Sequence, residues 1–175
     1  ADITKVTIGK ETLNQAILCN TRTIDGTVSG CDLRNIDFTW TNLSGVDLSG
    51  KDLTGANLSG VDLSGKDLSG TTLVQANLSG TDLSGVDLRN KDLTGANLSG
   101  INLSGANLTN AHLKGSYLID ADITNARIDK ENLDQAILCN TRTIDGTVSD
   151  CDLRKVDFTM TNLSGVDLRD KDLTG

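Results

Sequence analysis

The sequence predicts an all-β fold, a solenoid whose backbone completes one coil in about 20 residues. Three observations support this fold class. The 175 residues divide into 35 consecutive units of five, the third residue of a unit is apolar in 33 of the 35, and the fifth residue is Gly or Asn in 21. A period of five fits neither the 3.6-residue period of a helix nor the two-residue period of a half-buried strand.

Each unit is expected to be a short extended piece followed by a tight turn. The third residue and the small first residue point inward, and the second and fourth residues point outward. Gly or Asn at the fifth position supplies the positive φ of a type II turn, as in residues 58–61. Four such corners close one coil, and coils stacked about 4.8 Å apart pair their backbone groups. The expected core is a column of third-position leucines that includes Leu43, Leu63, Leu83, Leu93 and Leu103.

Individual units have a specific motif. ANLSG at 96–100, VDLSG at 61–65 and TNLSG at 41–45 resemble the A(D/N)LXX motif of pentapeptide repeat proteins. The resemblance extends over nearly the whole chain, and closely similar chains occur in cyanobacteria and chloroplasts. It implies a right-handed quadrilateral β-helix, and we therefore expect one solenoid over residues 1–175.

A longer repeat is superimposed on the period of five. Residues 121–175 match residues 1–55 at 43 of 55 positions, a shift of 120 residues. The chain ends within the second copy and without a polar capping segment, which a solenoid normally needs. The sequence is therefore either a window of a longer array or a rod whose open ends contact other copies lengthwise.

Composition excludes several classes of partner. The net charge is −8 and aromatic residues make up 2% of the chain, which argues against a basic or stacking surface for nucleic acid. No apolar run approaches the roughly 20 residues of a membrane span, so we expect no membrane insertion. These properties favour a protein partner, whose identity the sequence does not indicate.

We expect no catalytic, cofactor or metal site. The single histidine, His112, is at an outward second position, and no Ser-His-Asp or Cys-His arrangement can be built around it. The four cysteines lie in two pairs along the sequence, without a CxxC motif or a nearby His. An enzyme is the least supported function class.

Charged and amide side chains are expected to form columns along the coil. Outward Asp and Asn are predicted to form a solvated surface on which stacked Asn amides can hydrogen-bond along the rod, with cation binding by the Asp column as the alternative. The columns are Asn57, Asn77 and Asn97, and Asp47, Asp67 and Asp87. Charged residues at nominally inward first positions are expected to reach water near a corner; they are Glu11, Lys51, Lys66, Lys91, Glu131 and Lys171.

Two functions remain. The first is a structural or protein-interaction rod, which can assemble end to end. The second follows from the family resemblance, because some pentapeptide repeat proteins mimic duplex DNA and occupy the DNA site of gyrase. Those proteins commonly have Phe at the central position and a C-terminal dimerisation patch, whereas Leu dominates here.

The stretch AILCNTRTIDGTVS occurs at 16–29 and again at 136–149, and it interrupts the repeat with Thr23 and Thr143 at third positions. Stacked coils place Cys19 and Cys139 about 29 Å apart, which leaves only the pairs Cys19–Cys31 and Cys139–Cys151. These pairs can bond if the residues near 20–30 and 140–150 leave the coil as hairpins, with Asp25-Gly26 as a type I′ turn. Similar cyanobacterial family members have a comparable segment.

The state of the cysteines bears on location. Two disulfides would indicate an extracytoplasmic compartment, such as a thylakoid lumen, a periplasm or the extracellular space. The alternative is an unbroken coil with four reduced cysteines, which is compatible with the cytoplasm.

Overall fold

The computed structural model describes residues 32–39, 41–43 and 46–151. The chain divides into two compact units, residues 1–33 and 34–175. Only residues 32 and 33 of the first unit are described, so the architecture that the structure shows is that of the second unit. A single solenoid over residues 1–175 stays a prediction.

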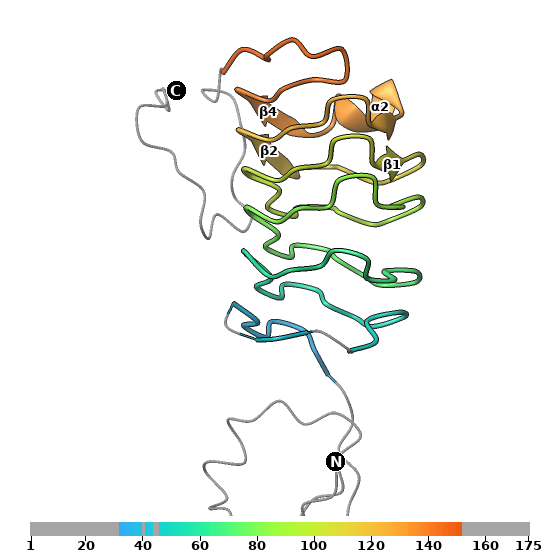
Figure 1. The fold of residues 1–175 in the computed structure, drawn as a ribbon. Coiled ribbons are helices and arrows are strands. Elements are labelled where there is room, and N and C mark those ends of the chain that lie inside the picture. The colour runs from blue at the N-terminus through green and yellow to red at the C-terminus, as the bar shows by residue number, and fades with distance from the viewer. Residues whose placement is uncertain (1–31, 40, 44–45, 152–175) are drawn as a thin grey trace, which may run out of the picture. The chain divides into compact units, whose positions relative to one another are not determined.

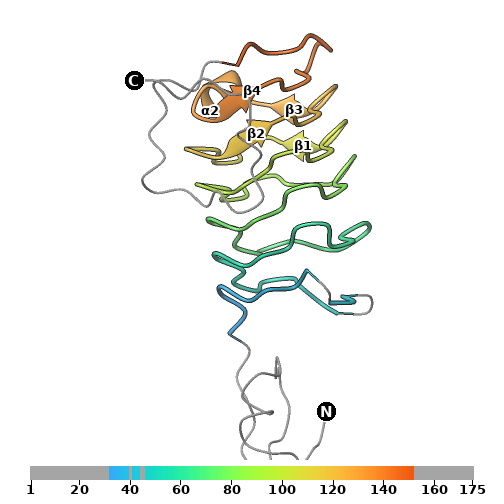
Figure 2. The ribbon, with the colours of Figure 1, turned by 90° about the vertical axis from the view of Figure 1, so that its left-hand side faces the viewer.

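The described part of the second unit is a stack of coils in which paired residues of neighbouring coils lie 20 positions apart in the sequence (Figures 1 and 2). All the paired rows between coils are parallel, as in the row Asn57, Asn77 and Asn97. Four of the paired segments are regular strands. β1 (Asn107–Leu108) pairs with β3 (Arg127–Ile128), and β2 (Tyr117–Ile119) pairs with β4 (Ile137–Cys139).

The corners have the turn that the fifth position predicts. In residues 58–61 the Val61 N–H donates to the Leu58 carbonyl at 3.0 Å, and Gly60 has a φ of 66°. The same positive φ recurs at successive fifth positions, so that one coil has four corners, for example at Gly100, Gly105, Asn110 and Gly115. At Gly70 the backbone also lies so close to the coil before it that a Cβ atom would be 3.3 Å from the Gly50 Cα.

The core is the column of third-position side chains inside the coils. The five leucines that the sequence places there are each at most 4% exposed: Leu43, Leu63, Leu83, Leu93 and Leu103. Small first-position residues fill the remaining interior, and Ala56, Ala76 and Ala96 are fully buried. Each buried Leu contributes roughly 1.5–3 kcal/mol, so this column stabilises the coil without an aromatic core.

One unit departs from the coil that the repeat predicts. Residues Lys130–Leu133 form a short helix, α2, in which the Asp134 N–H donates to the Lys130 carbonyl at 2.9 Å. Glu131 therefore lies exposed on a helix and not at an inward coil position. The cause is local, because the fifth position before this unit is Lys130, which does not adopt the positive φ of a corner.

The prediction that inward lysines reach water is wrong for Lys91. This residue is 6% exposed, and its Nζ atom lies 3.4 Å from the Thr71 carbonyl in the coil below. Burial lowers the pKa of the Lys91 ammonium, an effect that the nearby Asp67 and Asp87 carboxylates oppose. Lys66 follows the same pattern, since its Nζ donates to the carbonyls of Leu43 and Val46 at 2.5 and 3.1 Å.

Lys51 is half-buried, and Glu11 and Lys171 lie outside the described residues. A neutral polar residue at a first position behaves like Lys66, because the Thr71 hydroxyl donates to the Leu48 carbonyl at 2.8 Å. The polar side chains of Lys66 and Thr71 therefore bond to carbonyls of the preceding coil, whereas the hydroxyls of Thr81 and Ser116 donate to the carbonyls of Leu78 and Leu113 in their own coil.

Candidate interaction site

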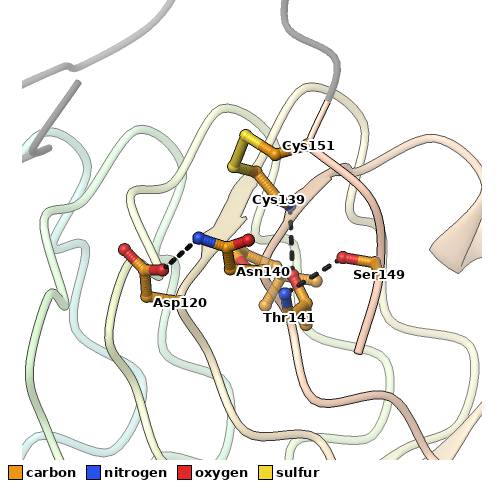
Figure 3. The surroundings of a disulfide bond; sticks show 7 residues. Asp120, Cys139, Asn140, Thr141, Ser149 and Cys151 are labelled. Carbon is orange, nitrogen blue, oxygen red and sulfur yellow. Dashed lines mark hydrogen bonds between the residues drawn. A yellow bond between two sulfur atoms is a disulfide. The ribbon is translucent and has the colours of Figure 1, made fainter. Parts of the chain in front are cut away.

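A disulfide joins Cys139, at the end of β4, to Cys151, and the two Cα atoms are 4.1 Å apart (Figure 3). The segment between them forms the hairpin predicted near 140–150. The equivalent cysteines of the first copy, Cys19 and Cys31, lie outside the described residues, as does the excursion near 20–30.

Backbone hydrogen bonds define the hairpin. The Thr143 N–H donates to the Thr147 carbonyl at 2.8 Å, the Ser149 N–H donates to the Thr141 carbonyl at 2.9 Å, and Arg142 lies opposite Val148. The first strand of the hairpin does not leave the coil, because Arg142 still exchanges 2.8 Å bonds with the backbone at Ala121 and Ile123. Only the second strand departs from the five-residue path. Thr143 therefore stays in the strand that follows the coil, where it is half-buried and its hydroxyl donates to the Asp145 carboxylate.

The turn differs from the type I′ turn expected for an Asp-Gly pair. That prediction was made for Asp25-Gly26, which lie outside the described residues, but the identical pair at 145–146 shows another geometry. The Gly146 N–H donates to the Thr143 carbonyl at 2.9 Å, and only Gly146 of the pair has a positive φ, of 83°. This is the three-residue loop in which a type I turn precedes a left-handed Gly.

The side chain of Asp145 accounts for this turn. Its Oδ1 atom accepts the Thr147 N–H at 3.1 Å and the hydroxyls of Thr143 and Thr147 at 2.6 and 2.8 Å. These bonds, of which the one from the Thr143 hydroxyl is the strongest, lower the pKa of Asp145 to about 2. The carboxylate is thus ionised at neutral pH, and it joins the two sides of the loop by accepting hydrogen bonds from Thr143 and Thr147.

The base of the hairpin is anchored to the coil below (Figure 3). Thr141 is fully buried, and its hydroxyl donates to the Leu118 carbonyl and accepts the Cys139 N–H. The Thr141 N–H in turn donates to the Ser149 hydroxyl at 3.0 Å. Beside it, the Asn140 amide donates to the Asp120 carboxylate at 3.2 Å. Together with the disulfide, these bonds hold the hairpin in one position.

An apolar cluster lies against the disulfide, at positions where the repeat predicts outward polar residues. Tyr117, Ile119 and Cys139 are at most 1% exposed, and Ile137 and Cys151 pack against them. Sequence reasoning missed this cluster. The available signal was that second and fourth positions are apolar in two units of successive coils, 116–120 and 136–140.

The hairpin also exposes apolar side chains. Ile144 is 43% exposed and Val148 is 60% exposed, and Val46 is the other large hydrophobic residue exposed within the described part of the chain. Two of these three residues therefore project from the hairpin that the disulfide closes. Exposed apolar groups on a loop fixed by a scaffold are typical of protein contact sites.

A family model described as "Pentapeptide repeats" matches the chain in 8 copies, over residues 27–60, 52–90, 92–129 and 132–170. The chain belongs to the pentapeptide repeat family. The hairpin is therefore an interruption within a pentapeptide repeat, because it falls inside the last matched segment.

Solved pentapeptide repeat structures are similar to parts of this chain. One from the cyanobacterium Cyanothece 51142 is 42% identical, with 49% of this chain and 61% of that chain covered and a TM-score of 0.40. One from the Arabidopsis thaliana thylakoid lumen is 30% identical, with 59% and 69% covered and a TM-score of 0.39. One from Nostoc Pcc 7120 is 34% identical, with 56% and 85% covered and a TM-score of 0.47.

The match to the Cyanothece protein therefore spans less than two thirds of that protein's length. No curated protein matches the chain.

The structure explains why this pentapeptide repeat prefers Asp or Asn at the second position and Ser or Thr at the fourth. The second-position side chain accepts the N–H of the residue two positions later, as in Asp62 with Ser64 and Asp82 with Ser84, both at 2.9 Å. The hydroxyl often donates to the same oxygen. The backbone bond recurs at Asp37, Asp47, Asp52, Asn57, Asp67, Asn77, Asp87, Asp92, Asn97, Asn102, Asn107 and Asp122.

These local bonds determine the electrostatics of the outward Asp columns. Hydrogen bonds from the hydroxyl and N–H of Ser64 lower the pKa of Asp62, and those from Ser84 lower the pKa of Asp82. The charge of Asp62 opposes the lowering of the pKa of Asp82. Hydrogen bonds from the N–H and hydroxyl of Ser69 lower the pKa of Asp67, and the charge of Asp47 opposes that shift, so carboxylates in successive coils repel.

Among the described residues, no three His, Cys, Asp or Glu side chains are grouped as ligands for a metal ion. Asp47, Asp67 and Asp87 are exposed, and their solvation stays a prediction. The prediction of a solvated column is wrong for Asn77 and Asn97, which are 2% and 0% exposed. His112 is exposed at its outward position. No helix in the described ranges is long and apolar enough to cross a membrane.

Proposed function

We propose that the protein is a non-enzymatic rod, a right-handed quadrilateral β-helix that contacts other proteins through its surface. The observation that carries this proposal is the hairpin at 141–150, which is fixed at its base by the Cys139–Cys151 disulfide and exposes Ile144 and Val148. A fixed loop loses little conformational entropy on binding, so even a small apolar contact retains its free energy.

The coil also favours lengthwise association. Each coil offers backbone N–H and C=O groups to the next coil in a constant register, as between Asn57, Asn77 and Asn97, and an uncovered terminal coil would offer the same groups to another chain. Light scattering over a concentration series tests this part of the proposal. A mass that increases with concentration, together with end-to-end rods in electron micrographs, supports it, and a strict monomer at high concentration contradicts it.

The disulfide supports an extracytoplasmic location, because disulfides persist in oxidising compartments. We extend this to a second disulfide, Cys19–Cys31, in the first copy of the segment, which differs between its cysteines only by Gly30 in place of Asp150. Mass spectrometry of unreduced peptides tests both pairs. Free thiols in protein prepared under oxidising conditions would indicate an unbroken coil and a reducing compartment.

A DNA mimic that acts on gyrase is the second candidate function. The observation that favours it is the repulsion within outward Asp columns that stay ionised, as for Asp47 with Asp67 and Asp62 with Asp82. A gyrase supercoiling assay separates the two functions. The interaction rod leaves supercoiling unchanged, whereas a mimic inhibits it at concentrations comparable to that of the enzyme and competes with DNA in a salt-dependent way.

A further inference from the structure

We propose that the outer face of the hairpin is a self-association surface, on which a second copy of this chain packs its own hairpin about a two-fold axis. The proposal rests on the interaction role proposed above and names the partner. The surface consists of Arg142 on the first strand, Ile144 in the loop, and Val148 and Asp150 on the second strand.

Strand geometry places three of these residues on one face. Arg142 lies directly opposite Val148, so both side chains project from the same side of the hairpin. Asp150 is two residues from Val148 along the second strand, which keeps it on that side, and Ile144 adds an exposed apolar side chain from the adjoining loop. Thr141 has the opposite parity and is fully buried against the coil, so the face of Arg142 and Val148 is the outer one.

The charges on this face are complementary to themselves. Arg142 and Asp150 are both exposed: Arg142 lies opposite Val148, and Asp150 is two residues from Val148 along the second strand. A two-fold axis in the plane of contact that sets Arg142 against the partner's Asp150 also brings the two Val148 side chains together. The arrangement thus pairs two opposite charges twice around an apolar centre.

Arg142 is available for this contact. Its Nε atom is 3.7 Å from the Asp122 carboxylate, and the two side chains are 59% and 42% exposed. An ion pair of this length and exposure contributes little free energy. The Arg142 guanidinium can therefore turn to a second carboxylate at small cost.

The surface is much smaller than the roughly 1,200 Å² that a stable interface buries, so the association is expected to be weak and to depend on concentration. Val148 is the centre of the contact and is 60% exposed in the single chain. Sedimentation velocity of the full chain at low salt should show a dimer that increases with concentration. Val148→Ser should raise the dissociation constant by about tenfold or more.

A matched control is Val46→Ser, which removes an exposed valine outside the hairpin, 42% exposed, and should leave the association unchanged. Equal weakening by Val46→Ser and Val148→Ser would overturn the proposal. Circular dichroism of each variant checks that the coil is retained.

A charge exchange gives the decisive test. Arg142→Glu alone sets two carboxylates against each other in both charge pairs of the dimer, and Asp150→Lys alone sets two cations against each other, so each variant should associate more weakly than the wild type. An equimolar mixture of the two variants restores both opposite-charge pairs and should associate like the wild type. Single variants that associate like the wild type, or a mixture that associates no better than the single variants, would overturn the proposal. Lengthwise association through coil ends would persist in every variant, so it is distinguished from the hairpin contact.

Discussion

The side-chain amide of Asn77 donates a hydrogen bond of 3.1 Å to the Oδ1 atom of Asn57, the residue 20 positions earlier. Its own Oδ1 atom accepts the Ser79 N–H at 3.1 Å. Asn77 is 2% exposed, so both functions of the amide are used away from water. An Asp carboxylate at position 77 could still accept the Ser79 N–H, but it could not donate a hydrogen bond to Asn57. Asp and Asn, the two residue types of the second motif position, are therefore not equivalent at position 77.

Asn77→Asp is expected to lower the free energy of unfolding by about 1–3 kcal/mol at neutral pH, because a buried carboxylate would face the Asn57 oxygen. The control is Asp82→Asn, which keeps the acceptor for Ser84 at an exposed position and should change stability by less than about 0.5 kcal/mol. Chemical denaturation of both variants measures the difference. Equal denaturation midpoints for the two variants would show that the hydrogen bond from Asn77 to Asn57 does not stabilise the coil.

Acid is expected to destabilise the protein. Hydrogen bonds within the repeat lower the pKa of many exposed Asp residues in the folded state, and that of Asp145 is about 2. Because these values lie below those of the unfolded chain, the stabilisation is fully present above about pH 4 and is lost as the pH falls towards 2. Thermal midpoints between pH 7 and pH 2 test this. A flat profile below pH 4 would show that the Asp bonds contribute nothing.

Lys66 and Lys91 are expected to respond oppositely to replacement by Met. Lys66→Met should lower the free energy of unfolding by about 1–3 kcal/mol, because the carbonyls of Leu43 and Val46 lose a charged donor. Lys91→Met should be neutral or stabilising, because the buried ammonium makes only a 3.4 Å contact with Thr71 and a buried charge costs free energy. Thermal denaturation compares the two. A larger loss for Lys91→Met would contradict these roles.

Leu93→Asp is expected to unfold the coil around it. Leu93 is 1% exposed, and an unpaired charge in the leucine column belongs to the class of substitutions that cost more than about 4 kcal/mol. Ser84→Asp, at an exposed fourth position, is the matched control and should leave the circular dichroism spectrum unchanged. Parent-like melting of Leu93→Asp would show that the third position does not face inward.

Removal of the Cys139–Cys151 disulfide by replacing both cysteines with Ser is expected to cost about 3 kcal/mol of unfolding free energy, as for other loops of this size. The hairpin should also become more sensitive to protease, because its base then depends on hydrogen bonds such as that between Thr141 and Ser149. Limited proteolysis followed by mass spectrometry measures this. An unchanged rate of cleavage within the hairpin would show that the hydrogen bonds, and not the disulfide, hold the hairpin in place.

The period of five was sufficient to predict the corners, the 20-residue register and the inward leucines. It was sufficient because a unit fixes its own geometry: the positive φ of Gly60 and the bond from Val61 to Leu58 involve only residues 58–61. The predictions that depended on contacts between different coils were less accurate. Lys91 was expected in water, but its position is set by Thr71 in the coil below.

The hairpin was also predicted only in part. The cysteine spacing predicted a loop closed at its base, and the structure contains it. The turn could not be predicted from Asp-Gly alone, because three bonds to the Asp145 carboxylate select the geometry and two of them come from threonine hydroxyls. The cluster at Tyr117 and Ile119 was visible only as a local loss of polar residues.

The constant register has a consequence for folding. Every paired row between coils closes a chain loop of the same length, as from Asn57 to Asn77 and from Asn77 to Asn97, so the entropy cost of adding a coil is similar wherever growth begins. No pair of coils is favoured as the nucleus by chain topology, and the order of assembly depends on local differences in coil stability. Hydrogen exchange should therefore be slowest in the coils with the best-buried interior and should increase gradually towards both ends of the stack.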